Sequence, residues 1–457
     1  MNTRLLFFLY NFVPFPMIKG TKFSSFYKSI METQYYNFDE LKDLINKLLL
    51  ETLQYASKNV QYYKEYTNGK FDLQDIKSLE ELNLLPILRK EDVRKNYQKL
   101  TSREIEKKKY TVDFTSGSTG TSINIVKFKD SIDKALAFYW RYNDWAGIRF
   151  SDRVVIITGS TFSNKKFYRY SFNKLFLSAF NMSKDTLPKY AELICDFKPI
   201  ALKGYPSAIT ILTRFMKKNN IKPPKVKSIS LTAECLTDEN RKEIFEYWGS
   251  RIQNIYGQAE NVVSIGECEK GNLHLSAEFG WMELVDENDK SVEVGKPGRI
   301  IGTGFTNFAM PLIRYDTRDV AVLSNERCSC GRSLPVVKSI EGRSEDIVIT
   351  PDGRMVGRLD AAFKYSNGIE LSQIIQEELD FITVKIVRGE NYSPRDIDRL
   401  EVELRKRLGT EIKINYVFVD NIERTPLGKL RFVISKVLPK IWGYNENIWK
   451  ITEKKWR

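Results

Sequence analysis

The chain has 457 residues, of which 42% are hydrophobic and 28% charged, a composition typical of a soluble globular protein and not of a disordered or fibrous one. The length suggests about two or three domains. A single histidine, His274, excludes sites built on several histidines, and five cysteines argue against a disulfide-stapled secreted protein. The net charge of +14 comes without a nucleic-acid motif or a long basic run, so we expect a solvated basic surface and no nucleic-acid partner.

The N-terminus carries a largely apolar stretch, Leu5–Ile18, interrupted by Asn11, Pro14 and Pro16. It is shorter than the roughly 20 residues that span a bilayer, and no small-residue cleavage site follows it. We expect an apolar helical segment over residues 1–30 that packs on the body or rests on a membrane surface. The protein is then expected in the cytoplasm, free or peripheral at the inner membrane face.

The first predicted elements are mainly helical. Apolar residues spaced by three and four predict a helix over 38–68, and a helical stretch broken at Pro86 is expected over 82–100. A strand over 110–114 precedes a loop rich in serine, threonine and glycine, and a helix is predicted over 130–145.

Short apolar strands then alternate with helices, which predicts an α/β fold with a largely parallel sheet. The strands are expected at 154–158, 201–205, 227–232 and 251–256, and the helices at 187–197, 207–219 and 238–248.

The pattern changes after Gly266. Residues 273–284 and 298–303 are predicted to be antiparallel strands, so this part is expected to be rich in β-structure. Beyond Gly342 a separate α+β unit is expected, with strands at 347–350, 383–388 and 412–419 and a helix at 393–408. The sequence Pro351-Asp-Gly353 marks a turn near the boundary.

The strongest local motif is Phe114-Thr-Ser-Gly-Ser-Thr-Gly-Thr121. Its backbone N–H groups and hydroxyls can approach an anion, yet it lacks the lysine of a Walker A loop. Alone, such a loop is usually an ordinary turn or linker.

This loop is the first of several motifs in the chain. In order they are Thr115–Gly120, Gly204-Tyr-Pro-Ser207, Asn254-Ile-Tyr-Gly-Gln-Ala-Glu260, Arg314-Tyr-Asp-Thr-Arg-Asp319, Cys328-Ser-Cys-Gly-Arg332, Glu341-Gly-Arg-Ser-Glu-Asp346 and Arg424-Thr-Pro-Leu-Gly-Lys429. This ordered set of boxes resembles the adenylate-forming superfamily of acyl- and aryl-CoA ligases. The likeness is greatest to the branch of phenylacetate–CoA ligase and CapK-type capsule biosynthesis proteins, and it runs from about Tyr110 to the end.

The resemblance implies a large adenylation domain over 1–342 with mainly parallel sheets and a β-rich subdomain, a hinge over 343–346, and a small mobile lid domain over 347–457. It implies that a carboxylic acid attacks ATP to give an acyl-adenylate, with transfer of the acyl group to coenzyme A or another acceptor, in surface polysaccharide biosynthesis. The alternative is a degenerate, membrane-associated assembly factor that binds nucleotide without catalysis.

The same resemblance implies roles for individual residues. Glu260 would hold Mg²⁺, a cation that prefers oxygen ligands; Arg343 would lie near the ribose and α-phosphate; and Lys429 would neutralise charge growing at the α-phosphate. Glu345 stands at the hinge position, where relatives usually carry aspartate, and the lysine that many relatives have after the phosphate loop is absent. The implied ATP/AMP site is Thr115, Ser116, Gly117, Ser118, Thr119, Gly120, Thr121, Ala233, Glu234, Tyr256, Gly257, Gln258 and Asp319.

A second constellation combines the only histidine with three cysteines: Cys268, His274, Cys328 and Cys330. Three thiolates and one imidazole suit a closed, tetrahedral, structural zinc site that would clip two hairpins together. The alternative is three reduced thiols and a surface histidine, because Cys-x-Cys is tighter than the usual spacing. The acyl pocket cannot be assigned, because aromatic residues at helical spacing such as Phe138, Tyr139 and Trp140 are more often core.

Overall fold

The computed structural model describes residues 20–66, 73–114, 123–341, 348–423 and 432–437, apart from residues 161, 163–165, 235, 237, 287, 353, 357–358, 360–361, 364–365, 367 and 390. Its helices are α3 (Thr21–Thr33), α4 (Phe38–Asn59), α5 (Gln61–Tyr66), α6 (Lys90–Lys95), α7 (Tyr97–Leu100), α8 (Lys129–Trp145), α9 (Leu187–Phe197), α10 (Pro206–Lys218), α11 (Asp238–Trp248) and α12 (Pro394–Leu408). Short 3₁₀ turns are η1 (Leu73–Asp75), η2 (Leu79–Leu84), η3 (Arg103–Glu106) and η4 (Ala179–Asn181).

A 12-stranded sheet is the largest in the described part of the chain. Strands β3 (Val154–Thr158), β5 (Lys174–Ser178), β6 (Ala201–Gly204), β7 (Ser228–Thr232) and β8 (Arg251–Gly257) form its parallel part, with β4 (Tyr168–Ser171) antiparallel at the edge. Beyond β8 the sheet continues antiparallel through β9 (Ser264–Glu267), β10 (Leu273–Leu275), β14 (Val336–Glu341), β13 (Tyr315–Ser324), β12 (Pro297–Gly304) and β11 (Gly280–Val285).

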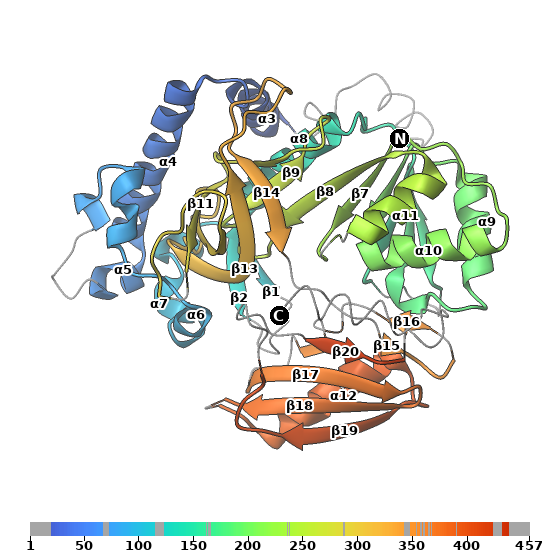
Figure 1. The fold of residues 1–457 in the computed structure, drawn as a ribbon. Helices are drawn as coiled ribbons and strands as arrows, with labels where there is room; N and C mark the ends of the chain where they lie inside the picture. The colour runs from blue at the N-terminus through green and yellow to red at the C-terminus, as the bar shows by residue number, and fades with distance from the viewer. Residues whose placement is uncertain are drawn as a thin grey trace.

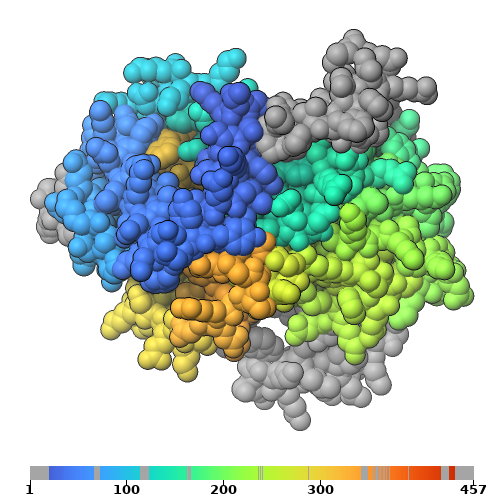
Figure 2. All heavy atoms as spheres, turned by 90° about the horizontal axis from the view of Figure 1, so that it is seen from above, coloured from blue at the N-terminus to red at the C-terminus, as the bar shows by residue number. Residues whose placement is uncertain are grey.

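Helices cover the sheet on both faces. Helices α9, α10 and α11 lie together beside the parallel strands, and α4 to α7 lie beside the antiparallel part (Figure 1). Helix α8 crosses the opposite face of the parallel strands. Two side chains of β8 donate to main-chain carbonyls of α8: Gln253 to that of Tyr142, and Arg251 to that of Trp145. Helix α3 packs along α8, and this N-terminal helix lies over the face of the molecule seen in Figure 2. Phe26 of α3 contacts Phe138 of α8, with ring centroids 5.9 Å apart.

In the described residues, the C-terminal domain consists of a small sheet and the helix α12. Its strands are β17 (Ile369–Glu378), β18 (Phe381–Arg388), β19 (Lys413–Phe418) and β20 (Val433–Ser435), and α12 packs on them. The pair β15 (Val348–Ile349) and β16 (Met355–Val356) precedes it. Phe180 of η4 belongs to this domain's hydrophobic cluster, so the domain contacts the large sheet where β5 ends (Figure 1).

The predicted α/β class is confirmed, and most predicted helices and parallel strands lie within a few residues of their expected bounds. The helix expected over 38–68 is wrong in its continuity, because it is divided at Val60. This buried, β-branched residue adopts an extended backbone with φ −121°, and α5 starts after it.

The antiparallel β-structure expected over 273–284 is present, but it is interrupted. It forms two strands, β10 and β11, which lie in different places in the sheet, with a turn between them in which the Phe279 N–H bonds the Ser276 carbonyl. A Cβ at Gly280 would lie 2.0 Å from the Val262 carbonyl oxygen, so only glycine allows the backbones to approach there.

The predicted 1–30 helical segment is described only from residue 20, and residues 21–30 lie in α3. The predicted hinge at 343–346 lies outside the described residues. Within the described part of the chain, every helix is too short or too polar to cross a membrane.

Candidate active site

The predicted nucleotide-site residues that the structure describes gather at the carboxyl ends of parallel strands. Ala233 and Glu234 follow β7, and Gly257 ends β8; Gly204 of the Gly-Tyr-Pro-Ser box, which has no predicted nucleotide role, ends β6 beside them. In open α/β sheets, ligands bind outside this edge. The strand order therefore brings together motifs that are separated by up to about fifty residues in the chain.

Glu234 links the end of β7 to the start of α10. One carboxylate oxygen accepts from the Ser207 N–H and the other from the Ser207 hydroxyl, both at 2.9 Å. Ser207 lies in the first turn of α10, so the acid satisfies an N–H at a helix N-terminus and is favoured by the helix dipole. The Tyr205 hydroxyl accepts from the Gly159 N–H at 3.0 Å and fastens β6 to the loop after β3.

Asp319 of β13 is held beside the strand ends. Its Oδ2 accepts a hydrogen bond of 2.8 Å from the Tyr256 hydroxyl at the end of β8. Two boxes 63 residues apart are thereby joined, as expected if both contact one ligand. The two arginines of the 314–319 box have structural roles: buried Arg314 pairs with Glu283 at 2.9 Å, and Arg318 pairs with Glu91.

Glu260 lies in the turn after β8. One of its oxygens accepts from the Tyr315 hydroxyl at 3.0 Å, and no hydrogen bond to the other oxygen is found among the described residues. A carboxylate with one oxygen fixed and the other available suits a hard cation such as Mg²⁺. The neighbouring Gln258 accepts instead from the Val263 N–H at 3.3 Å, which shapes the turn.

The phosphate-loop residues 115–121, together with Arg343, Glu345 and Lys429, lie outside the described residues. The loop connects β1 (Tyr110–Phe114) to β2 (Asn124–Phe128), which form an antiparallel hairpin. Lys127 ties this hairpin to the Glu260 turn: its ammonium pairs with Asp113 at 2.8 Å and donates to the Asn261 side chain at 3.4 Å. Lys127 is not among the residues predicted from the sequence, although a lysine between Val126 and Phe128 in a strand is an available signal.

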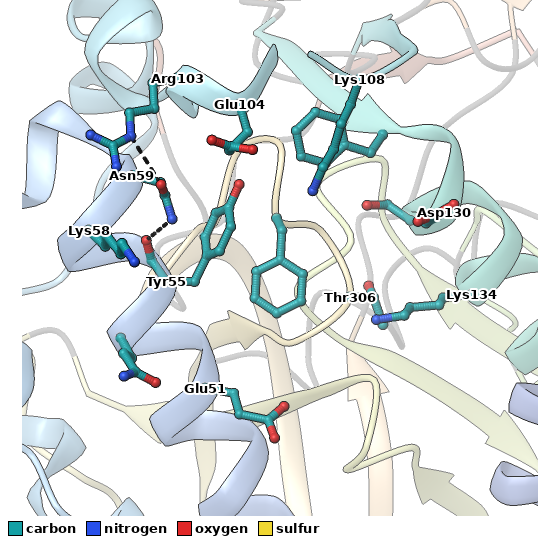
Figure 3. A pocket seen from close by; sticks show the side chains of 14 residues that line it. Glu51, Tyr55, Lys58, Asn59, Arg103, Glu104, Lys108, Asp130, Lys134 and Thr306 are labelled. Carbon is teal, nitrogen blue, oxygen red and sulfur yellow. Dashed lines mark hydrogen bonds between the residues drawn. The ribbon is translucent and has the colours of Figure 1, made fainter. Parts of the chain in front are cut away.

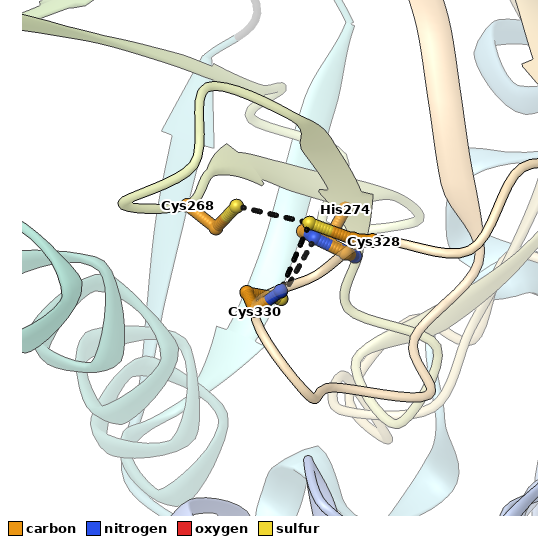
Figure 4. A group of neighbouring side chains, drawn as sticks. All are labelled: Cys268, His274, Cys328 and Cys330. Carbon is orange, nitrogen blue, oxygen red and sulfur yellow. Dashed lines mark hydrogen bonds between the residues drawn. The ribbon is translucent and has the colours of Figure 1, made fainter.

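The four predicted metal ligands are together in space (Figure 4). Their ligand atoms lie within 4.8 Å of one another, with Cys268 Sγ 3.6 Å from Cys328 Sγ and Cys330 Sγ 3.4 Å from His274 Nε2. A tetrahedral ion with metal–sulfur bonds of about 2.3 Å requires neighbouring ligands at about these spacings. The cluster joins the β9–β10 hairpin to the loop between β13 and β14.

The surroundings of the cluster orient its histidine. The ring Nδ1 lies 3.1 Å from the Leu334 carbonyl oxygen, so Nδ1 carries the proton and Nε2 offers its lone pair to the sulfur side. Burial, as the largest cause, lowers the pKa of His274, which favours the neutral ring that binds metal. The Asn272 side-chain amide donates to Cys328 Sγ at 3.2 Å, and Arg332 pairs with Glu269 at 2.9 Å beside it.

A pocket of about 820 Å³ lies away from the strand ends, between α4, the base of the β1–β2 hairpin and the start of α8 (Figure 3). Lys58, Arg103, Lys108 and Lys134 are interleaved there with Glu51, Glu104 and Asp130, around the rings of Tyr55, Phe128 and Phe308. Because both signs of charge line it, the pocket offers no single-sign field to a ligand.

Comparison with known proteins agrees with the boxes. Residues 348–436 match the CapK C-terminal domain family. Protein CapK of Staphylococcus aureus is 28% identical over 420 residues, which are 87% of this chain and 90% of that protein. The phenylacetate–coenzyme A ligase of Thermus thermophilus is 23% identical over 87% of this chain and 96% of its own length.

Solved structures give the same fold. A 2-hydroxyisobutyryl-CoA ligase in complex with 2-HIB-AMP and CoA superposes with a TM-score of 0.59 at 19% identity, covering 90% of this chain and 94% of that one. The homologues of this chain are therefore CapK and phenylacetate–CoA ligases, and its fold is that of the acyl-CoA ligases. The resemblance inferred from the boxes is confirmed.

Proposed function

We propose that this protein activates a carboxylic acid with ATP to form an acyl-adenylate and pyrophosphate, and then transfers the acyl group to coenzyme A or another acceptor. The meeting of Tyr256 with Asp319 and of Tyr315 with Glu260 at one sheet edge is the observation that carries the proposal. The homologues named above, which match most of the chain, support it.

The described residues suit the adenylation step. Asp319, oriented by the Tyr256 hydroxyl, accepts hydrogen bonds from the ribose hydroxyls, as a carboxylate does well. Glu260 holds Mg²⁺, which neutralises phosphate charge when bound. The main-chain and hydroxyl groups of residues 115–121 bind the β- and γ-phosphates, and Ala233, Glu234 and Gly257 border the adenine.

Arg343 and Lys429 complete the proposed machinery. Arg343 binds near the ribose and α-phosphate, and Lys429 offsets the charge that grows on the α-phosphate as the acid attacks. Glu345 serves as the hinge between a large domain ending near residue 342 and a mobile lid beginning near 347, so that Lys429 approaches for adenylation and withdraws for transfer.

The Cys268, His274, Cys328 and Cys330 cluster holds a structural zinc ion in this proposal. The donor set, its spacing and the histidine tautomer all suit zinc. When bound, the ion supplies only a cross-link between two loops, because four protein ligands leave no open position for chemistry.

We place this reaction in surface polysaccharide biosynthesis, supported by the similarity to CapK. The protein then acts in the cytoplasm, free or at the inner membrane face.

Separate assays of the two half-reactions test the proposal. Wild-type protein with ATP, Mg²⁺ and a panel of acids should release pyrophosphate, and Lys429→Ala should slow this step by orders of magnitude. Given ready-made acyl-adenylate and acceptor, the same variant should transfer at nearly the normal rate. If the protein binds ATP but none of the acids in the panel causes pyrophosphate release, the result would instead favour the non-catalytic assembly factor.

A further inference from the structure

Lys203 of β6 is a buried lysine that has no counter-charge among the residues that the structure describes. Only 7% of its surface is exposed, and its ammonium donates to the Tyr139 hydroxyl at 3.0 Å and to the Asn143 side-chain oxygen, both on α8. No carboxylate in the described part of the chain lies within 4.0 Å of it. Burial lowers the pKa of Lys203 to about 7, which shows how poorly its surroundings replace water around the charge.

Lys203 belongs to a polar row that crosses three parallel strands beneath α8. In register, Lys203 lies beside Ser230 of β7, and Ser230 beside Gln253 of β8. All three are buried, and the Ser230 hydroxyl donates to the Gln253 side chain at 3.0 Å. Strands of a parallel sheet are normally apolar on both faces, so this row departs from what packing alone would select.

A second cation lies near the first. Lys174 of β5 also has a lowered pKa, caused mainly by burial, and its charge interacts with those of Tyr139 and Lys203. The groups around Lys203 are therefore a phenol and an amide from α8, Ser230 beside it in register on β7, and the positive Lys174. The local field is positive, because no carboxylate of the described residues lies within 4.0 Å of the ammonium.

The row also lies within reach of the proposed reacting centre. Lys203 is two residues from Tyr205, and Gln253, at the same level, is three residues from Tyr256, or about 10 Å along a strand. Tyr139, which covers Lys203, keeps 37% of its surface exposed, so the lysine lies one side chain from solvent.

We propose that the acid activated by this protein carries a second anionic group at its far end, and that Lys203 binds that group. This inference rests on the proposed function and names its substrate class. The reacting carboxylate lies at the strand ends beside Glu260 and Asp319, and the chain of the acid runs between α8 and the sheet. The distal anion meets Lys203, with Lys174 adding to the field.

Binding to the full-length protein, measured by calorimetry with AMP present, tests the inference independently of turnover. The probes are matched pairs of equal chain length: glutarate with valerate, adipate with hexanoate, and pimelate with heptanoate. Wild-type protein should bind at least one dicarboxylate about ten- to a hundredfold more tightly than its partner, the range of a buried charge-assisted hydrogen bond. Lys203→Met should remove that preference and leave monocarboxylate binding unchanged or stronger.

Further probes and controls make the result specific. The monomethyl ester of the preferred dicarboxylate should bind like the monocarboxylate, and an ω-phosphono acid of the same length shows whether the distal group is a carboxylate or a phosphonate. Lys217→Met removes an exposed lysine at the end of α10 and should change nothing. Equal binding of both members of every pair by wild-type protein, or an unchanged preference in Lys203→Met, would overturn the inference.

Pyrophosphate release over the same panel separates this inference from the proposed function. If monocarboxylates are activated as well as dicarboxylates, the protein is an adenylating ligase and the role of Lys203 is wrong. If dicarboxylates bind in a Lys203-dependent way but no acid releases pyrophosphate, the site is correct and the proposed reaction is wrong.

Discussion

Two polar clusters of the main sheet pack against α8. In one of them, which we call the closed cluster, the polar groups converge on one another; in the other, a buried charge has no opposite charge nearby among the described residues. In the antiparallel part, three thiols and His274 converge on one point, and the Leu334 carbonyl fixes the histidine. In the parallel part, Lys203 donates to two neutral oxygens, and no carboxylate of the described residues lies within 4.0 Å of its ammonium.

The contrast shows how to distinguish a structural polar cluster from a binding one. Buried polar groups persist when they are fully satisfied, as four ligands around a metal are. A buried charge without a partner destabilises the fold and is retained where a ligand supplies the missing group. Replacing a member of the closed cluster should therefore harm stability, whereas replacing Lys203 should improve it.

The largest effect is expected from opening the closed cluster. Cys328→Ser removes one of four ligands and should lower the free energy of unfolding by about 4 kcal/mol, the scale typical of losing a metal site. Purified wild-type protein should carry about one zinc per chain, and the variant much less, as measured by elemental analysis.

Cys195→Ser is the matched control. This free cysteine lies outside the cluster and is only partly buried, so its replacement should cost less than about 1 kcal/mol. Equal losses in denaturant unfolding of the two variants, or wild-type protein without zinc when prepared without chelator, would show that the cluster is not a metal site.

Lys203→Met should stabilise the ligand-free protein by a few kcal/mol near pH 6. The folded pKa of Lys203, about 7, lies below the ordinary value of 10.5 that the unfolded chain has, so the unfolded state binds more protons between these values. Wild-type stability should therefore rise as pH increases from about 7 towards 10, and its deficit relative to the variant should shrink. Chemical denaturation at several pH values measures this.

Lys174→Met serves as the companion variant, because the pKa of Lys174 is also lowered. Its own contribution to the pH dependence should be smaller than that of Lys203. A constant difference in stability between wild type and Lys203→Met across the whole pH range would mean that Lys203 has a counter-charge after all.

Two tyrosines at the strand ends allow a matched pair of smaller changes. Tyr256→Phe removes the 2.8 Å hydrogen bond to Asp319, and Tyr315→Phe the 3.0 Å bond to Glu260, each worth about 1–2 kcal/mol. Under the proposed function, the first should raise KM for ATP up to about tenfold at saturating Mg²⁺, and the second should raise the Mg²⁺ concentration needed for half-maximal rate. Identical effects of both variants on ATP and on Mg²⁺ would contradict the separate roles of the two carboxylates.

Four of the five parallel strands follow closely from local sequence, because they are short runs between helices of clear periodicity, whereas β5 is not predicted. The strand β7 begins within one residue of its predicted start. The antiparallel part follows less closely: the sequence pattern does not predict β13 and β14, and it does not show where β10 ends and β11 begins. There the pairing partners are distant in sequence, and turns such as that at Ser276 are fixed by tertiary contacts.

For the candidate site, the boxes contain residues that lie together in the fold. The sequence does not show which of these residues face a ligand and which make contacts within the protein. Arg314 and Arg318 belong to the same box as Asp319, yet they make ion pairs that hold β13. Lys203 could not be predicted from the sequence, because a single lysine in a four-residue strand gives no hydrophobic periodicity that would mark it as buried. Its importance is visible only when burial, register and the absence of a nearby carboxylate among the described residues are considered together.

The smallest effect is expected at Lys127, the buried lysine that does have a carboxylate. Its side chain is 7% exposed and pairs at 2.8 Å with Asp113, whose side chain is 49% exposed. Lys127→Met leaves Asp113 in contact with water and should cost only about 1 kcal/mol or less. Asp113→Asn should cost more, because the buried ammonium keeps only a weak partner, the Asn261 oxygen at 3.4 Å. A double-mutant cycle followed by thermal unfolding measures the coupling energy between Lys127 and Asp113. If Asp113, and not Lys127, is the buried member of the pair, Lys127→Met should cost more stability than Asp113→Asn.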